Sequence, residues 1–320
     1  MKNIQADIKS GNFKQVYLLY GEEAYLKQQY KQNLVKALNP DGDTMNFNHY
    51  EGKGIDVKQL IDLCETMPFF AERRVVLLED TGFFKNKCEE LADYMKELPD
   101  YLYLVFSETE VDKRNRMYKA VKACGSIAEF IRQDEKTLMR WAAGILGKAG
   151  KKITQRDMEL LLTKTGTDMG NLRMEMEKLI SYTEGRDVVT AEDIEEICTT
   201  QTTNRIFDMV RAVTEKNQKR ALELYYDLLT LKEPPMRILF LLAKQYRQLL
   251  LAKQFAAAGL AQTEIASKLG VPGFVVRNIT TCARAYTISE LEQAVKDFVD
   301  AEESVKTGRL EDKLSVELLI

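Results

Sequence analysis

The first part of the chain alternates short apolar runs with longer amphipathic stretches. Five runs have the length of β-strands: residues 15–20, 44–50, 73–79, 101–107 and 126–131. Two of them contain uninterrupted apolar segments, VVLL and YLYLVF, which are typical of strands covered on both faces of a parallel sheet. Helical spacing of apolar residues appears between the runs, over 22–38, 56–67, 85–98 and 114–124. This alternation predicts an open α/β domain over residues 1–131.

After residue 131 the apolar spacing becomes helical throughout. Residues 132–203 contain four successive helical segments, which begin near the candidate N-caps Asp134, Thr154, Asp168 and Thr190. Thr190 and Asp193 have nearly the spacing of a capping box, and Gly150, Gly166 and Gly185 stand where helices end. Residues 204–320 are again helical, interrupted mainly at Pro234-Pro235 and at the turn 269–273. We therefore predict three domains: the α/β domain (1–131) and two all-α domains (132–203 and 204–320).

Composition narrows the class of protein. The 320 residues include 46 basic and 49 acidic side chains, a net charge of −3, so any DNA contact should be local or shared with partners. The five cysteines are scattered, which indicates neither a disulfide framework nor a zinc site. The polar N-terminal stretch lacks the apolar segment of a signal peptide, and no apolar run reaches the ~20 residues needed to span a membrane. We expect a cytoplasmic protein that does not contact the membrane.

The stretch QVYLLYGEEAYL (15–26) has the strand, glycine turn and helix of a phosphate-binding loop. Such a loop needs a Lys and a hydroxyl residue, and here Glu22, Glu23 and Ala24 follow Gly21. VVLLED (75–80) resembles a Walker B strand, but a buried strand followed by a solvated acidic turn has the same pattern. His49, the only histidine, would have to serve any Ser-His or Cys-His catalytic centre. The sequence therefore predicts no ATP hydrolysis, no catalytic residue, no metal site and no cofactor.

The segment MPFFAERR (67–74) is a candidate interface. Two adjacent phenylalanines follow Pro68 and precede a buried strand. Both rings could cap the hydrophobic core, although neighbouring side chains in an extended turn point in different directions. Alternatively Met67, Phe69 and Phe70 are exposed anchors for a partner, because aromatic rings provide large apolar area at low entropic cost. Spacing alone leaves both interpretations open.

A helix–turn–helix pattern occupies TEIASKLGVPGFVVRNI (263–279). Reading of bases requires polar side chains on the second helix, and this segment offers Arg277 and Asn278 among apolar residues. That composition favours a packed helical turn. The alternative function is a helix–turn–helix DNA-binding protein with an α/β sensor domain, which the slightly acidic composition disfavours.

Taken together, five motifs resemble the delta subunits of bacterial DNA polymerase III clamp loaders. They are VYLLYGEEAYL (16–26), MPFFAERRVVLLED (67–80), DKRNRMYKAV (112–121), GTDMGNLRMEMEKL (166–179) and VKTGRL (305–310). The motifs are individually weak, but they occur in the family's order and spacing over essentially the whole chain. The resemblance implies an AAA+ architecture: a RecA-like domain with a degenerate phosphate loop, a helical lid and a helical collar that mediates oligomerisation.

The resemblance also implies function. Delta subunits join gamma/tau and delta-prime subunits in a five-membered ring, bind the beta sliding clamp and help to open it for loading onto primed DNA. The clamp-binding positions that match here are Phe69 and Phe70, with Met67 just upstream; Phe69 departs from the family's frequent Leu-Phe pair. DKRNR (112–116) lacks the Ser-Arg-Cys motif of catalytic neighbours. Nucleotidyl transfer would need carboxylates around two metals, so any DNA-directed DNA polymerase activity would belong to the holoenzyme.

Overall fold

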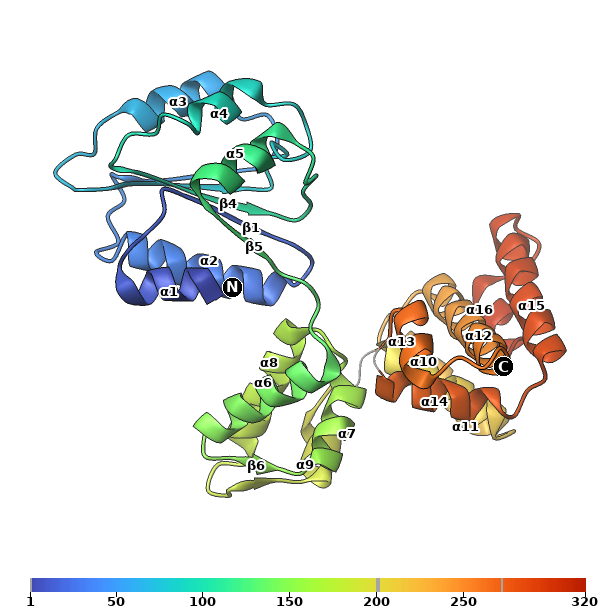
Figure 1. Ribbon diagram of the computed structural model, residues 1–320. Coiled ribbons are helices and arrows are strands. Elements are labelled where there is room, and N and C mark those ends of the chain that lie inside the picture. The colour runs from blue at the N-terminus through green and yellow to red at the C-terminus, as the bar shows by residue number, and fades with distance from the viewer. Residues whose placement is uncertain (1, 200–201, 272) are drawn as a thin grey trace. The chain divides into compact units, whose positions relative to one another are not determined.

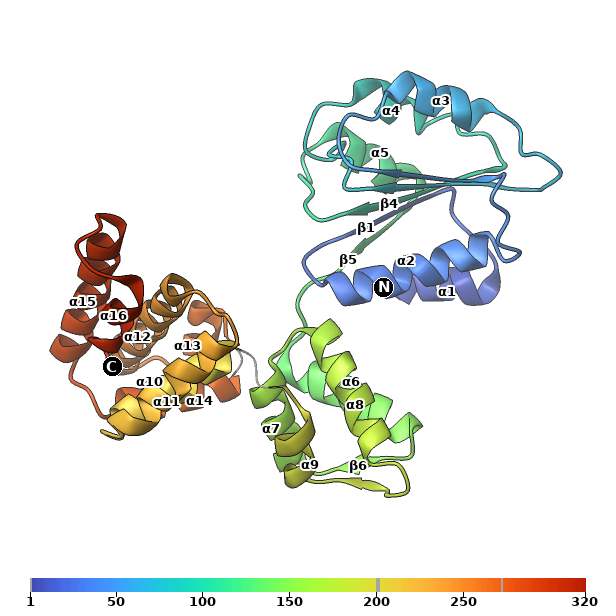
Figure 2. The same cartoon turned by 180° about the vertical axis from the view of Figure 1, so that it is seen from behind.

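A computed structural model describes residues 2–199, 202–271 and 273–320 of the chain (Figures 1 and 2). The chain divides into two compact units, Met1–Gln133 and Asp134–Ile320. None of the helices in the described ranges is long and apolar enough to cross a membrane.

The first unit is built on a five-stranded parallel sheet. Its strands are β1 (Val16–Tyr20), β2 (Phe47–Glu51), β3 (Arg74–Glu79), β4 (Leu102–Glu108) and β5 (Ser126–Glu129). The order across the sheet is β2-β3-β4-β1-β5, with every neighbouring pair parallel. The predicted α/β domain with a parallel sheet is confirmed, and each predicted run agrees with its strand to within three residues at either end.

Helices cover both faces of the sheet. The helices α1 (Lys2–Ser10) and α2 (Ala24–Leu38) lie on one face, and α3 (Val57–Glu65), α4 (Glu89–Tyr94) and α5 (Arg116–Cys124) lie on the other (Figures 1 and 2). The sequence analysis missed α1 and predicted a longer α4 over 85–98. The segment before α4 does not extend the helix; instead the Asn115 side chain donates a hydrogen bond to the carbonyl of Asn86.

The alternation of side chains along each strand creates two cores. In β1, Val16, Leu18 and Tyr20 join the cluster beneath α3, α4 and α5. Tyr17 and Leu19 join the cluster beneath α1 and α2. Because both sets are buried, the strand shows no polar alternation in sequence, which is the reason that the uninterrupted apolar runs identified the central strands.

The second unit is almost entirely helical. Its first part contains α6 (Glu135–Lys148), α7 (Gln155–Thr165), α8 (Met169–Tyr182) and α9 (Ala191–Ile197). The side chains of Asp134, Thr154, Asp168 and Thr190 accept backbone hydrogen bonds as N-caps, and Thr190 with Asp193 forms the predicted capping box. Two short strands were not predicted: β6 (Lys152–Ile153) pairs with β7 (Val188–Val189) and joins the loops that precede α7 and α9.

The remaining helices surround a hydrophobic core of their own, whose buried residues lie between Ile206 and Val316. They are α10 (Thr202–Thr214), α11 (Gln218–Thr230), α12 (Pro235–Ala257), α13 (Gln262–Leu269), α14 (Gly273–Ala283), α15 (Ile288–Lys306) and α16 (Asp312–Glu317). Pro235 occupies the first turn of α12. An N–H at this position would find no acceptor within the helix, so the lack of one in proline costs no hydrogen bond. The predicted turn 269–273 contains Gly270 with a φ of 64°, whereas Pro272 lies outside the described residues. The division of residues 132–320 into lid and collar domains stays a prediction.

The turn between β1 and α2 is pressed against the end of β5. The amide of Phe130 donates to the carbonyl of Tyr20 (2.7 Å), and the amide of Glu23 donates to the carbonyl of Phe130 (3.0 Å). Gly21 lies between these bonds with a φ of 124°, and a Cβ there would approach the carbonyl oxygen of Phe130 to 2.3 Å. Only glycine fits, because both the backbone angle and the space exclude a side chain.

We predict that Gly21→Ala lowers the free energy of unfolding by about 2–4 kcal/mol, since the backbone must shift to admit the methyl group. The matched control is Gly11→Ala, where φ is 74° but no atom lies within 4 Å of the added Cβ. There only the backbone strain remains, about 1 kcal/mol. Urea unfolding of both variants tests this, and equal losses would contradict the packing argument.

Candidate functional site

The carboxyl edge of the sheet is where a nucleotide would bind in this architecture. Only Gly21, Glu22 and Glu23 separate β1 from α2, and the amide of Glu23 is already bonded to Phe130. Two glutamates at a helix N-terminus repel phosphate groups where a phosphate loop would supply free amides and a lysine. The turn therefore has the strand and helix of a nucleotide site without its anion cradle.

The acidic residues at the end of β3 are engaged within the protein. Glu79 Oε1 lies 2.5 Å from Lys31 Nζ, and its Oε2 lies 2.9 Å from His49 Nε2. Asp80, at a φ of 46°, accepts hydrogen bonds from the amide (2.9 Å) and the hydroxyl (2.8 Å) of Thr109. Neither carboxylate is left as a free metal ligand, and the His49 ring contacts Glu79. Among the described residues, no group of three or more His, Cys, Asp or Glu side chains could hold a metal ion.

The end of β4 adds a buried carboxylate and a partly buried amine. Glu108 accepts hydrogen bonds from the amide (3.1 Å) and the hydroxyl (2.6 Å) of Thr81, and burial raises the pKa of its carboxyl group. Lys27 donates from Nζ to the carbonyl oxygen of Glu108 at 2.9 Å, and burial lowers the pKa of its amine. The charged groups at this edge are thus hydrogen-bonded within the protein.

The loop before β3 lies at the opposite, amino edge of the sheet and exposes its apolar side chains. Met67 is 75% exposed, Phe69 is 56% exposed and Phe70 is 95% exposed. The two rings contact each other edge to face, with centroids 4.4 Å apart. The interpretation in which both rings cap the core is wrong. We call residues 66–70 the docking loop.

The backbone of the docking loop is held by two buried polar side chains. Asn46, 3% exposed, accepts from the amide of Phe69 (2.7 Å) and donates to its carbonyl (2.8 Å). Arg74, 5% exposed, donates to the carbonyls of Thr66 (2.9 Å) and Met67 (3.3 Å). The loop therefore presents its rings from a fixed backbone.

Sequence reasoning missed these supporting residues. Asn46 lies between exposed Met45 and the start of β2, and Arg74 is the first residue of a strand whose next residues are apolar. An arginine as the first residue of a buried strand was the available signal, because a buried guanidinium needs acceptors close by. Which backbone atoms supply those acceptors depends on the tertiary structure.

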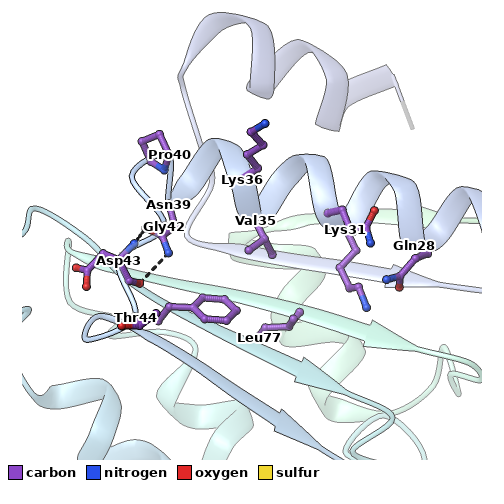
Figure 3. A pocket seen from close by; sticks show the side chains of 12 residues that line it. Gln28, Lys31, Val35, Lys36, Asn39, Pro40, Gly42, Asp43, Thr44 and Leu77 are labelled. Carbon is purple, nitrogen blue, oxygen red and sulfur yellow. Dashed lines mark hydrogen bonds between the residues drawn. The ribbon is translucent and has the colours of Figure 1, made fainter.

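A pocket of about 570 Å³ lies beside α2 at the edge of the sheet (Figure 3). Val35, Phe47 and Leu77 form its apolar part, and the segment 39–44 forms one side. The Asn39 side chain exchanges two hydrogen bonds, each 2.9 Å, with the backbone of Asp43 (Figure 3). The pocket brings no set of catalytic side chains together. Asp43 in its lining accepts a hydrogen bond from the side chain of Asn46.

The predicted helix–turn–helix segment is present as α13 and α14. Ile265, Val276 and Ile279 are buried in the core of this part of the second unit. Arg277 and Asn278 are exposed on α14. Most of the second helix's apolar residues therefore serve packing, and nothing here tests an interaction with DNA.

Comparison with known proteins supports the resemblance. Residues 17–130 match the family described as DNA polymerase III, delta subunit, and residues 203–320 match its C-terminal domain. The chain is 26% identical to DNA polymerase III subunit delta of Bacillus subtilis, over 99% of this chain and 95% of the relative. It is 22% identical to the probable DNA polymerase III subunit delta of Aquifex aeolicus, over 80% and 75% of the two chains. The solved structure of the Bacillus subtilis DNA clamp loader delta protein has a similar fold, with a TM-score of 0.67, 24% identity and coverage of 99% and 97%.

The buried carboxyl group at the carboxyl edge generates a pH prediction. Burial raises the folded-state pKa of the Glu108 carboxyl group above its ordinary value of 4.5. The folded protein therefore keeps this carboxyl group protonated to a higher pH than the unfolded chain does. Its contribution to the free energy of unfolding therefore falls as pH rises through the interval between the two pKa values. We expect Glu108→Gln to gain stability relative to the parent chain as pH rises above 4.5, measured by urea unfolding. A difference that is flat with pH would contradict this assignment.

Proposed function

The chain belongs to the DNA polymerase III delta subunit family, and from this membership we propose that it binds the beta sliding clamp through the docking loop. It would help to open the clamp for loading onto primed DNA during replication. The observation that carries the proposal is the exposure of Met67, Phe69 and Phe70 on a loop whose backbone is held from within the sheet. An apolar set of this kind has the character of an interface anchor.

The energetics of such an anchor are favourable. Burying a phenylalanine side chain is worth about 1.5–3 kcal/mol, and a prearranged loop loses little further entropy on binding. A clamp is a closed ring held by its own subunit interfaces. A ligand that binds the open ring more tightly shifts the population toward opening by that difference in affinity alone.

This chain would act without ATP hydrolysis of its own. The occupied acidic groups and the missing anion cradle at the carboxyl edge support that proposal. ATP would act on the partner subunits that bind it, and the gamma/tau and delta-prime subunits would complete the loader. The helical parts over 132–203 and 204–320 would serve as lid and collar, and exposed apolar side chains on the collar helices, Tyr226, Leu231 and Phe240, suit contacts with partner collars. DNA would pass through the assembled complex.

We predict that Phe69→Ala/Phe70→Ala weakens binding to the sliding clamp of the same organism by about 4 kcal/mol, roughly a thousandfold in Kd. The loss follows from removing the two apolar anchors while their supporting hydrogen bonds, which use backbone atoms at position 69, remain available. Surface plasmon resonance or calorimetry with the purified chain measures it.

The matched control is Phe240→Ala, which removes an equally exposed ring (62%) from α12. Its clamp affinity should equal that of the parent chain. Clamp binding that survives the double substitution undiminished would place the contact elsewhere, and a parent chain that binds no clamp would contradict the proposed function.

A second prediction concerns nucleotides. The purified chain should show no saturable binding of a fluorescent ATP analogue with Mg²⁺ and no ATP turnover, because Glu22 and Glu23 occupy the turn between β1 and α2 and Glu79 is paired with Lys31. Turnover that scales with the concentration of this chain and survives repurification would identify an active ATPase instead.

A further inference from the structure

Residues 67–70 of the docking loop lack the backbone hydrogen bonds that usually fix a loop: within the described part of the chain, their backbone forms none with another backbone group. Phe70 also adopts a φ of 49°, an unfavourable conformation for a bulky side chain. A strained residue persists only where its surroundings determine the conformation. The side chains that contact the loop must therefore supply that constraint.

Asn46 makes the most direct contribution. Its side-chain amide accepts from the N–H of Phe69 and donates to the C=O of Phe69. In a β-sheet these two bonds would come from the backbone of a neighbouring strand. The Nδ2 of Asn46 also donates to Asp43 Oδ2 at 2.5 Å, which fixes the orientation of the amide. The same bond is the main reason that the pKa of Asp43 lies below its ordinary value.

Asp43 is in turn held by Asn39, the residue that ends α2. The contacts form a continuous series from the end of α2 through Asp43 and Asn46 to the backbone of Phe69. Arg74 secures the other side of the loop at Thr66 and Met67. None of these polar side chains needs to touch a partner for the rings to be placed.

Building on the proposed function, we infer that Asn46 is a positioning residue for clamp binding: it fixes the backbone of Phe69 so that the two rings are presented in their binding arrangement. Its effect on affinity passes through the rings, because prearrangement removes an ordering cost from binding. This role separates Asn46 from the anchors themselves and from residues that only stabilise the fold.

The test is a double-mutant cycle with the purified full-length chain and the sliding clamp of the same organism. Asn46→Ala should weaken binding at least tenfold in the parent background and less than twofold in the Phe69→Ala/Phe70→Ala background. Asn46→Asp should also weaken binding, because its carboxylate cannot donate to Phe69 and lies beside Asp43. Hydrogen exchange at the amide of Phe69 should accelerate in Asn46→Ala, because that variant loses the acceptor of this amide.

Thr81→Ala is the control for a general loss of stability. Thr81 is also buried and hydrogen-bonded, but it lies at the carboxyl edge with Glu108. This variant should unfold at lower urea concentration and bind the clamp as the parent does. Unchanged affinity in folded Asn46→Ala, or an equal loss in both backgrounds of the cycle, would overturn the inference. A parent chain that binds no clamp would instead refute the proposed function together with it, so the two failures are distinguishable.

Discussion

Hydrogen bonding between the parallel strands is the constraint on which the first unit depends. Because all five strands run in one direction, their ends gather at two different edges of the sheet. The turn after β1 and the acids after β3 and β4 meet at the carboxyl edge. The loop before β3 and the segment before β2 meet at the amino edge, where Val75 donates to the carbonyl of Asn46 at 2.9 Å. The sheet thus separates the turn after β1 and its neighbouring acidic residues from the docking loop.

The carboxyl edge of the sheet gathers charged side chains from α2, β3 and β4. Charged side chains that are partly removed from water must find partners within the protein, because desolvation without compensation is costly. Glu79 is paired with Lys31 and His49, and Glu108 is bonded to Thr81. These contacts leave the carboxylates at this edge engaged within the protein.

At the amino edge the usual distribution of polar and apolar side chains is reversed. Asn46 and Arg74 are buried, whereas the apolar side chains of the docking loop are exposed. Asn46 and Arg74 direct their hydrogen bonds at the backbone of the docking loop, which leaves the side chains of Met67, Phe69 and Phe70 in solvent. An exposed apolar set on a fixed backbone suits binding to a partner, since the ordering cost is met during folding. The relatives identified by sequence are DNA polymerase III delta subunits.

Much of the architecture could be predicted from the sequence, because local rules govern it. Uninterrupted apolar runs identified buried parallel strands, and Asp134, Thr154, Asp168 and Thr190 identified the starts of helices through bonds to their own neighbouring amides. The helix α1, the shortened α4 and the β6–β7 pair escaped prediction, because contacts distant in sequence determine them. The sequence also pointed to residues 67–70 but left open whether their rings were buried. Only the tertiary structure decided that question, since the residues that turn the rings outward, Asn46 above all, act across 23 positions of the chain.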